Sequence, residues 1–241
     1  MFQFRQFNEI PPVIRNLLLA NGVFFLAQNV FPWFNDLFAL HFYTSPLYKP
    51  WQIITHMFMH GGFSHLLFNM LTLWMFGSIL EQVWGSKRFL IFYFFSGIAA
   101  TLLHTIVIAI TYYKNVALLG PNELQIIKDC IVNGSIYNKE LPQYGIVIAK
   151  TLLTKTLGAS GAIYGVMAAF AYLFPNTILN IYMIFPIKAK YAMGGMILLE
   201  FILGTTNIAG DNVAHFAHLG GALMGLILVY YWNKTNRKTL Y

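Results

Sequence analysis

Two segments that lie far apart in the chain hold the residues best suited to chemistry. Ser160 stands between small residues in Gly158-Ala-Ser-Gly161, and two histidines, His215 and His218, lie one helical turn apart in an apolar stretch. A serine at a helix start has an accessible hydroxyl and free backbone N–H groups nearby. Such a hydroxyl becomes a nucleophile when a neutral imidazole takes its proton. The two segments therefore predict a nucleophile, Ser160, and its base, His218.

Each of these segments continues into a pair of glycines spaced four residues apart. The glycines are Gly161 and Gly165 after the serine, and Gly221 and Gly225 after the histidine. Small residues at this spacing let two membrane helices approach closely. If the two faces pack together, Ser160 and His218 come to the same depth. The alternative is that Gly-Ala-Ser-Gly is only a helix-packing sequence.

The sequence predicts a pair rather than a triad. The nearest acid before His218 is Asp211, seven residues away, which is about 10 Å along a helix and too far for a direct hydrogen bond. Glu200 lies in another apolar stretch, at a depth that the sequence does not define. We therefore expect a Ser-His dyad. Tyr164, one turn after Ser160, could position the imidazole by stacking, or could simply fill the core.

A second polar group occurs in the segment His60-Gly-Gly-Phe-Ser-His65-Leu-Leu-Phe-Asn69. His65 and Asn69 are four residues apart, so they share one face of a helix, and both can donate hydrogen bonds. His60 enters from the turn just before. Polar side chains inside membrane spans mark function by default, but Asn and His also hold helices together. The sequence leaves both interpretations open.

Metal binding is the rival explanation for so many histidines. An all-imidazole site is conceivable for four of them: His60, His65, His215 and His218. No HExxH pattern occurs, and the only carboxylate near these histidines in sequence is that of Asp211. A metal site would also leave Ser160 and Asn69 without a role. We expect no metal and no cofactor.

The composition indicates a membrane protein. Hydrophobic residues make up 58% of the 241 residues and charged residues only 10%, against about 25% charged in soluble domains. The net charge of +7 does not indicate nucleic acid, because Lys and Arg cluster at the ends of apolar runs, where they bind anionic lipid. A single cysteine, Cys130, excludes an intrachain disulfide framework.

Six apolar ranges are long enough, or nearly so, to cross a bilayer. They are residues 13–34, 64–83, 89–112, 160–174, 190–206 and 213–232. A long polar external loop is expected over 114–155, and a turn near 175–190. The prediction is an all-α membrane protein, a bundle of six transmembrane helices forming one domain over 1–241.

Basic residues in the short connections predict the orientation. They flank the first range, fall between the second and third and between the fourth and fifth, and follow the sixth: Arg5, Arg15, Lys87, Arg88, Lys188, Lys190, Lys234, Arg237 and Lys238. With six spans, all of these positions lie on one side. Both termini are therefore expected in the cytoplasm.

The sequence resembles the rhomboid family. Three elements carry the resemblance: His60-x4-His65-x3-Asn69 in the second span, Gly158-x-Ser160-Gly161 with Tyr164 in the fourth, and Ala217-His218-x2-Gly221-x3-Gly225 in the sixth. The resemblance implies Ser160 as nucleophile and His218 as general base and then acid. It implies His65 and Asn69 as oxyanion donors together with the Ser160 N–H, and His60 as a structural histidine. Trp51-Gln52 stands where many members have Trp-Arg.

What the resemblance implies is an intramembrane serine endopeptidase of bacterial type, placed in a bacterial cytoplasmic membrane. Its partners would be single-span membrane protein substrates and the lipid bilayer, with no nucleic acid. The first alternative is a catalytically silent relative that binds transmembrane segments without cutting them. The second is a His-based metal or haem membrane protein. The natural substrate and the oligomeric state stay open.

Overall fold

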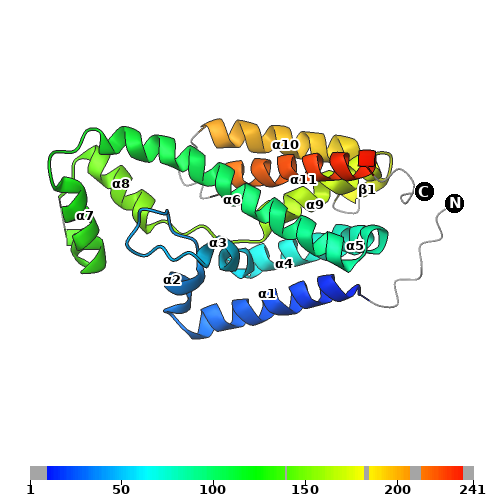
Figure 1. Ribbon diagram of the computed structural model, residues 1–241, viewed down its shortest axis with the longest axis horizontal. Helices are drawn as coiled ribbons and strands as arrows, with labels where there is room; N and C mark the ends of the chain where they lie inside the picture. The colour runs from blue at the N-terminus through cyan, green and yellow to red at the C-terminus, as the bar shows by residue number, and fades with distance from the viewer. Residues whose placement is uncertain (1–9, 139, 182–184, 207–212, 236–241) are drawn as a thin grey trace.

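A computed structural model describes residues 10–138, 140–181, 185–206 and 213–235 of the chain (Figure 1). The α-helices in these residues are α1 (Pro12–Val30), α2 (Phe34–Phe38), α3 (Gln52–Thr55), α4 (Phe63–Thr72), α5 (Ser78–Trp84), α6 (Ser86–Val116), α7 (Glu123–Val132), α8 (Gln143–Leu153), α9 (Ser160–Leu173), α10 (Ala189–Thr206) and α11 (His215–Thr235). Short 3-10 turns are η1 (His56–Phe58) and η3 (Ser135–Asn138), and a π turn is η2 (Leu73–Gly77). The strands are β1 (Ile178–Ile181) and β2 (Phe185–Lys188).

The helices form a bundle with lipid-facing surfaces. Three helical segments in the described residues are long and apolar enough to cross a membrane: Pro12–Val30, Phe63–Trp84 and Ser86–Val116. Large apolar side chains point outward from them, such as Leu26 on α1 and Phe68 on α4, which are 67% and 65% exposed. A helix satisfies its own backbone groups, so it can present such a surface to lipid. The molecule is an integral membrane protein built mainly of helices.

Helix α9 is the centre of the bundle. It packs against α6, α11, α10 and α4, and Figure 1 shows it between the upper helices and α4. Nine of its 14 residues are buried, and most of these nine are glycine or alanine. A helix that is apolar on all sides must be covered on all sides. Ser160 is therefore the first residue of the most enclosed helix in the bundle.

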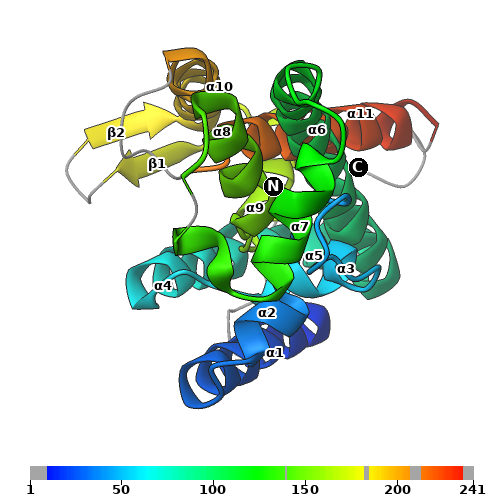
Figure 2. The same ribbon diagram turned by 90° about the vertical axis from the view of Figure 1, so that its left-hand side faces the viewer.

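A helix lies over each of the six expected apolar ranges, but the fold is not purely helical. Between α9 and α10, strands β1 and β2 pair antiparallel, with Ile178 opposite Lys188 and Ile181 opposite Phe185. The sequence predicted only a turn here. The isoleucines of β1 favour extended backbone, and Pro186 in β2 cannot sit inside a helix. Figure 2 shows the hairpin projecting to one side of the helices.

The stretch predicted as a long polar loop, residues 114–155, is mainly helical. It contains α7 and α8, and α6 runs on into it as far as Val116. Apolar side chains of α7 and α8 form a second core with the loop after α2 and the end of α6; its buried members are Phe42, Tyr112, Ile127, Ile131, Ile136, Ile148, Ala149 and Leu152. Burial of these apolar side chains explains why the insertion is folded. Figure 2 shows α7 and α8 at one end of the bundle.

The helix ends that carry the basic residues lie together at the opposite end. Figure 1 shows the first turn of α1, the junction of α5 with α6, the β1–β2 hairpin and the last turn of α11 at one end, and α7 and α8 at the other. Arg15, Lys87, Arg88 and Lys234 belong to those helix ends. Arg5, Arg237 and Lys238 lie outside the described residues.

Gln52 anchors the loop between α2 and α3. Its side chain is fully buried. The amide Nε2 lies 3.2 Å from the carbonyl oxygen of Asp36 and 3.2 Å from that of Leu47, and Oε1 accepts a hydrogen bond from the backbone N–H of His41 at 3.2 Å. Gln52 thus holds α2 and two points of the loop that follows it.

Replacing Gln52 by alanine is expected to lower the free energy of unfolding by about 1–3 kcal/mol, because buried backbone groups lose their partners. Thermal unfolding in detergent measures this change. Gln125→Ala is the matched control. Among the described residues the exposed Gln125 side chain bonds only Asp129, on its own helix, and a change within about 0.5 kcal/mol is expected. Equal melting temperatures for the two variants would remove the anchoring role of Gln52.

Candidate active site

Ser160 is placed by an extended segment that leads into α9. The backbone of Thr156 pairs with that of Leu40, and the N–H of Gly158 donates to the carbonyl of His56 at 2.9 Å. Gly158 has φ +126°, and a Cβ there would lie 2.9 Å from the ring of His65. Only glycine adopts this conformation without strain. The chain therefore turns into the helix at a fixed point, which leaves the first N–H groups of α9 without partners in their own helix.

The structure brings Ser160 and His218 into contact. Nε2 of His218 lies 2.8 Å from Oγ of Ser160, within hydrogen-bond distance. His218 is 9% exposed and Ser160 is half-buried. The two residues come from α9 and α11, 58 positions apart. A serine and an imidazole in this geometry can transfer a proton between them.

The glycine faces of α9 and α11 bring the two helices together. A Cβ added to Gly221 would lie 1.8 Å from the carbonyl oxygen of Gly161, and one added to Gly225 would lie 2.5 Å from that of Gly165. No side chain fits between the backbones at these two points. The close approach expected from the small-residue spacing is present, and Ser160 and His218 lie next to it.

Tyr164 lies flat against His218. The two rings are parallel within 5°, and their centroids are 4.2 Å apart. The hydroxyl of Tyr164 donates a hydrogen bond to Oε1 of Glu200. The stacked tyrosine limits rotation of the imidazole, because the ring cannot turn without losing this contact.

A carboxylate whose depth the sequence did not define, that of Glu200, lies behind the histidine. Oε1 of Glu200 is 2.9 Å from Nδ1 of His218, and Oε2 is 2.6 Å from Nδ1 of His215. The contact between His218 and Glu200 has the distance of an ion pair. Glu200 belongs to α10, and only packing shows its depth. Asp211 lies outside the described residues.

The second polar group lies on α4 and the turn before it. The His65 ring lies beside Gly158, where an added Cβ would lie 2.9 Å from it, and packs edge-on against His60, with 5.1 Å between ring centroids. Asn69 is buried, and among the described residues its Nδ2 has no hydrogen-bond partner. A buried amide donor normally has an acceptor. Within the part of the chain that the structure describes, this donor is not used by another protein atom.

His60 is held through its backbone. Its N–H donates to Oε1 of Gln28 at 3.0 Å, and its carbonyl accepts a hydrogen bond from Nε2 of the same glutamine. The ring of His60 is fully buried beside His65. Gln28 is on α1, so these two hydrogen bonds connect α1 to the turn before α4.

Comparison with known proteins identifies the family. The family model described as the rhomboid domain matches residues 48–234. The chain belongs to the rhomboid family. Rhomboid proteins are generally intramembrane serine proteases, and they act on membrane proteins within the bilayer. The matched range contains His60, His65, Asn69, Ser160, Tyr164, Glu200, His215 and His218.

Three relatives show how far the similarity of this rhomboid reaches. It is 28% identical over 189 residues to "Rhomboid protein 1, mitochondrial" of Saccharomyces cerevisiae, covering 78% of this chain and 43% of the yeast protein. It is 24% identical over 234 residues to "Putative rhomboid protease YdcA" of Bacillus subtilis, covering 94% and 92%. It is 26% identical over 181 residues to "Rhomboid protease AarA" of Providencia stuartii, covering 74% and 54%. The chain thus spans less than half of the yeast protein.

Sequence reasoning missed the carboxylate of this rhomboid, although a signal was present. Glu200 is the only acidic residue between Pro175 and Asp211. An ionisable residue inside an apolar run marks a functional position by default. The sequence does not show how α10 is rotated about its axis, and this rotation decides whether Glu200 faces lipid or His218.

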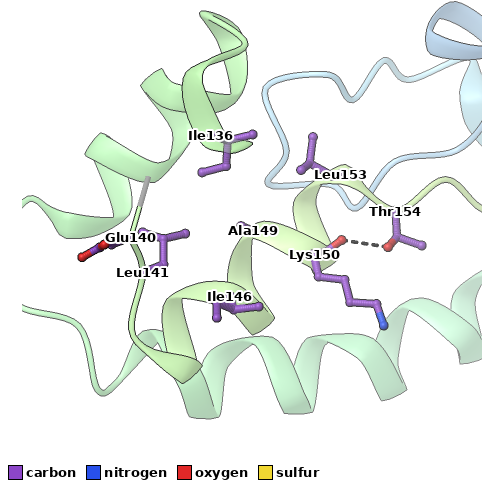
Figure 3. Close-up of a pocket in the computed structure, with 8 residues that line it drawn as sticks. All are labelled: Ile136, Glu140, Leu141, Ile146, Ala149, Lys150, Leu153 and Thr154. Carbon is purple, nitrogen blue, oxygen red and sulfur yellow. Dashed lines mark hydrogen bonds between the residues drawn. The ribbon is translucent and has the colours of Figure 1, made fainter. Parts of the chain in front are cut away.

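Two further observations concern binding sites elsewhere. The described residues contain no group of three or more His, Cys, Asp or Glu side chains placed to hold a metal ion. A cavity of about 710 Å³ lies in the insertion and is lined by Ile136, Glu140, Leu141, Ile146, Ala149, Lys150, Leu153 and Thr154 (Figure 3). All of these belong to the insertion, away from Ser160 and His218.

Proposed function

We propose that this rhomboid is a serine endopeptidase that cleaves transmembrane segments of single-span membrane proteins. The observation that carries the proposal is the 2.8 Å contact between Ser160 Oγ and His218 Nε2. His218 takes the hydroxyl proton at Nε2 while Oγ attacks the carbonyl carbon of a peptide bond. The same nitrogen then returns the proton to the departing amine, and an ester to Ser160 remains.

The negative oxygen formed in this attack needs donors aimed at it. We assign this role to the backbone N–H of Ser160 and the side chains of Asn69 and His65. The buried Nδ2 of Asn69, which has no partner among the described residues, supports the assignment. So does the position of the His65 ring beside Gly158, two residues before Ser160, where an added Cβ would lie 2.9 Å from the ring. His60 supports His65 through ring packing.

Hydrolysis of the ester requires water inside the bundle. A cavity of about 20 Å³ adjoins Ser160, and its lining includes the polar side chains of His56 and Thr101. Room for one water begins at roughly 10–15 Å³, provided that polar partners are present. We propose that this cavity supplies the water that attacks the acyl group, with His218 again as the base.

The proposed topology is six spans in one domain over 1–241, with both termini in the cytoplasm. The spans are α1, α4 with α5, α6, α9, α10 and α11. The gathering of basic helix ends at one end of the bundle supports this orientation. The proposed location is a bacterial cytoplasmic membrane, supported by the similarity along nearly the full length to the Bacillus subtilis protein.

Purified protein incubated with a panel of single-span membrane proteins tests the function. We expect cleavage of at least one member inside its membrane segment, and covalent labelling by a fluorophosphonate probe that blocks this cleavage. An intact protein that neither labels nor cleaves would favour the silent relative that only binds transmembrane segments. Cleavage that the probe does not block would point to another nucleophile.

Asn69→Ala tests the oxyanion assignment. Losing one donor typically lowers turnover by about 10²–10³-fold, and we expect a loss of that size with little change in melting temperature. Turnover per labelled molecule and thermal unfolding are measured on the same preparation. Asn21→Ala is the control, because the buried side chain of Asn21 bonds, among the described residues, only Leu17 on its own helix. If Asn69→Ala is less stable but fully active, Asn69 fastens helices and does not bind the oxyanion.

A further inference from the structure

Glu200 is a buried carboxylate with partners on both of its oxygens. Its side chain belongs to α10 and is 7% exposed. Oε1 accepts a hydrogen bond from Tyr164 and lies 2.9 Å from Nδ1 of His218, while Oε2 lies 2.6 Å from Nδ1 of His215. All three partners belong to α9 and α11, the helices that carry Ser160 and His218. A carboxylate at this depth is unfavourable unless it is paired.

The geometry at His218 determines which ring nitrogen carries the proton. Nε2 faces the hydroxyl of Ser160 at 2.8 Å, and it must be unprotonated to accept the hydroxyl proton. In a neutral imidazole the other nitrogen then carries the hydrogen. That nitrogen, Nδ1, is the one that faces Oε1 of Glu200. The carboxylate therefore favours the tautomer that leaves Nε2 free to act as a base.

Proton transfer makes this contact stronger. When Nε2 takes the proton of Ser160, the imidazole becomes a cation with hydrogens on both nitrogens. The cation then lies 2.9 Å from a carboxylate oxygen, in a site that excludes most water, where opposite charges attract strongly. The carboxylate therefore acts on His218 through its charge at this short distance.

We propose that Glu200 is a positioning residue of the reaction, which fixes the tautomer of His218 and stabilises the imidazolium formed when Ser160 loses its proton. The proposal rests on the proposed function and deepens it, because it adds a carboxylate to the Ser-His pair. Glu200 touches neither the substrate nor Ser160. It acts through His218, and Tyr164 holds the carboxylate in place.

A purely structural role is the competing explanation. By joining Tyr164 of α9 to His215 of α11, Glu200 could simply fasten three helices together. Glu200→Gln separates the two roles, because the amide oxygen still accepts a hydrogen bond from Tyr164 while the negative charge is lost. In Ser-His-Asp enzymes the change of the acid to its amide lowers kcat by about 10⁴-fold.

The experiment compares Glu200→Gln with the parent protein in detergent. We expect kcat and the maximal rate of fluorophosphonate labelling to fall at least about tenfold, with KM and melting temperature unchanged. Glu81→Gln is the matched control, because Glu81 is also buried but caps the backbone of Val13 and Ile14 at the start of α1. It is expected to lower the melting temperature and leave turnover per labelled molecule unchanged.

Tyr164→Phe provides a second comparison, because it removes the hydrogen bond to Glu200 but keeps the stacked ring and the charge. A loss smaller than that of Glu200→Gln supports the proposal. If Glu200→Gln keeps kcat within about twofold of the parent, or is impaired only in stability, Glu200 is a fastener. Whether Glu200 proves to be a positioning residue or a structural one, cleavage by the parent protein still supports the proposed function. A parent that neither labels nor cleaves overturns the proposed function and this inference together.

Discussion

Ser160→Ala is expected to abolish cleavage and fluorophosphonate labelling. In serine proteases the loss of the nucleophile lowers kcat on the order of 10⁴–10⁶-fold. The fold should tolerate the change, because it removes one hydroxyl at the start of α9 whose described hydrogen bond is to His218. We expect the free energy of unfolding to change by about 1 kcal/mol or less. Cleavage of a single-span substrate and thermal unfolding are measured on the same preparation.

Ser78→Ala is the control for Ser160→Ala. Ser78, like Ser160, is the first residue of a helix; it is buried, and among the described residues its hydroxyl has no hydrogen-bond partner. Both variants remove the same atom, but only one removes the proposed nucleophile. The Ser78 variant should cleave and label as the parent does. Cleavage that persists after Ser160→Ala would reject the serine mechanism.

Gly221→Ala is expected to reduce activity and stability together. Its Cβ would lie 1.8 Å from the carbonyl oxygen of Gly161, whereas ordinary contact begins at 3.4 Å. The obstacle is backbone, so α9 and α11 must move apart. Overpacking of this kind destabilises a protein by about 1–3 kcal/mol or more. His218 lies one turn before Gly221, and a displacement of about 1 Å at a reacting group can lower turnover roughly 10²-fold.

Two other glycines serve as comparisons for Gly221→Ala. At Gly225 the added Cβ would lie 2.5 Å from the Gly165 carbonyl, one turn further from His218, so a smaller loss of activity is expected. Gly195 in α10 has open space around it, and alanine there should keep full activity and stability. Turnover is expressed per molecule that the fluorophosphonate labels, so that unfolded protein does not count. Full turnover in Gly221→Ala would show that helix contact does not set the site geometry.

The sequence by itself determined the features that depend on residues close together in the chain. The apolar ranges predict helices because a membrane helix satisfies its own backbone groups, and a helix lies over each range. The spacing of Gly161 with Gly165 and of Gly221 with Gly225 predicts close approach, and the two backbones do meet. Given that contact, the meeting of Ser160 with His218 follows.

Only the tertiary structure decided which side chains meet across helices whose rotation the sequence does not specify. Glu200 faces His218 because the side of α10 that carries it packs against α11. Lipid-facing and core residues are both apolar, so the hydrophobic pattern of α10 does not show which side faces the protein. Gln52 reaches three segments of a folded loop, and no spacing in the sequence predicts this. The insertion folds because its apolar residues meet Phe42 and Tyr112 from other parts of the chain. These contacts are long-range, so they exist only once the helices have packed.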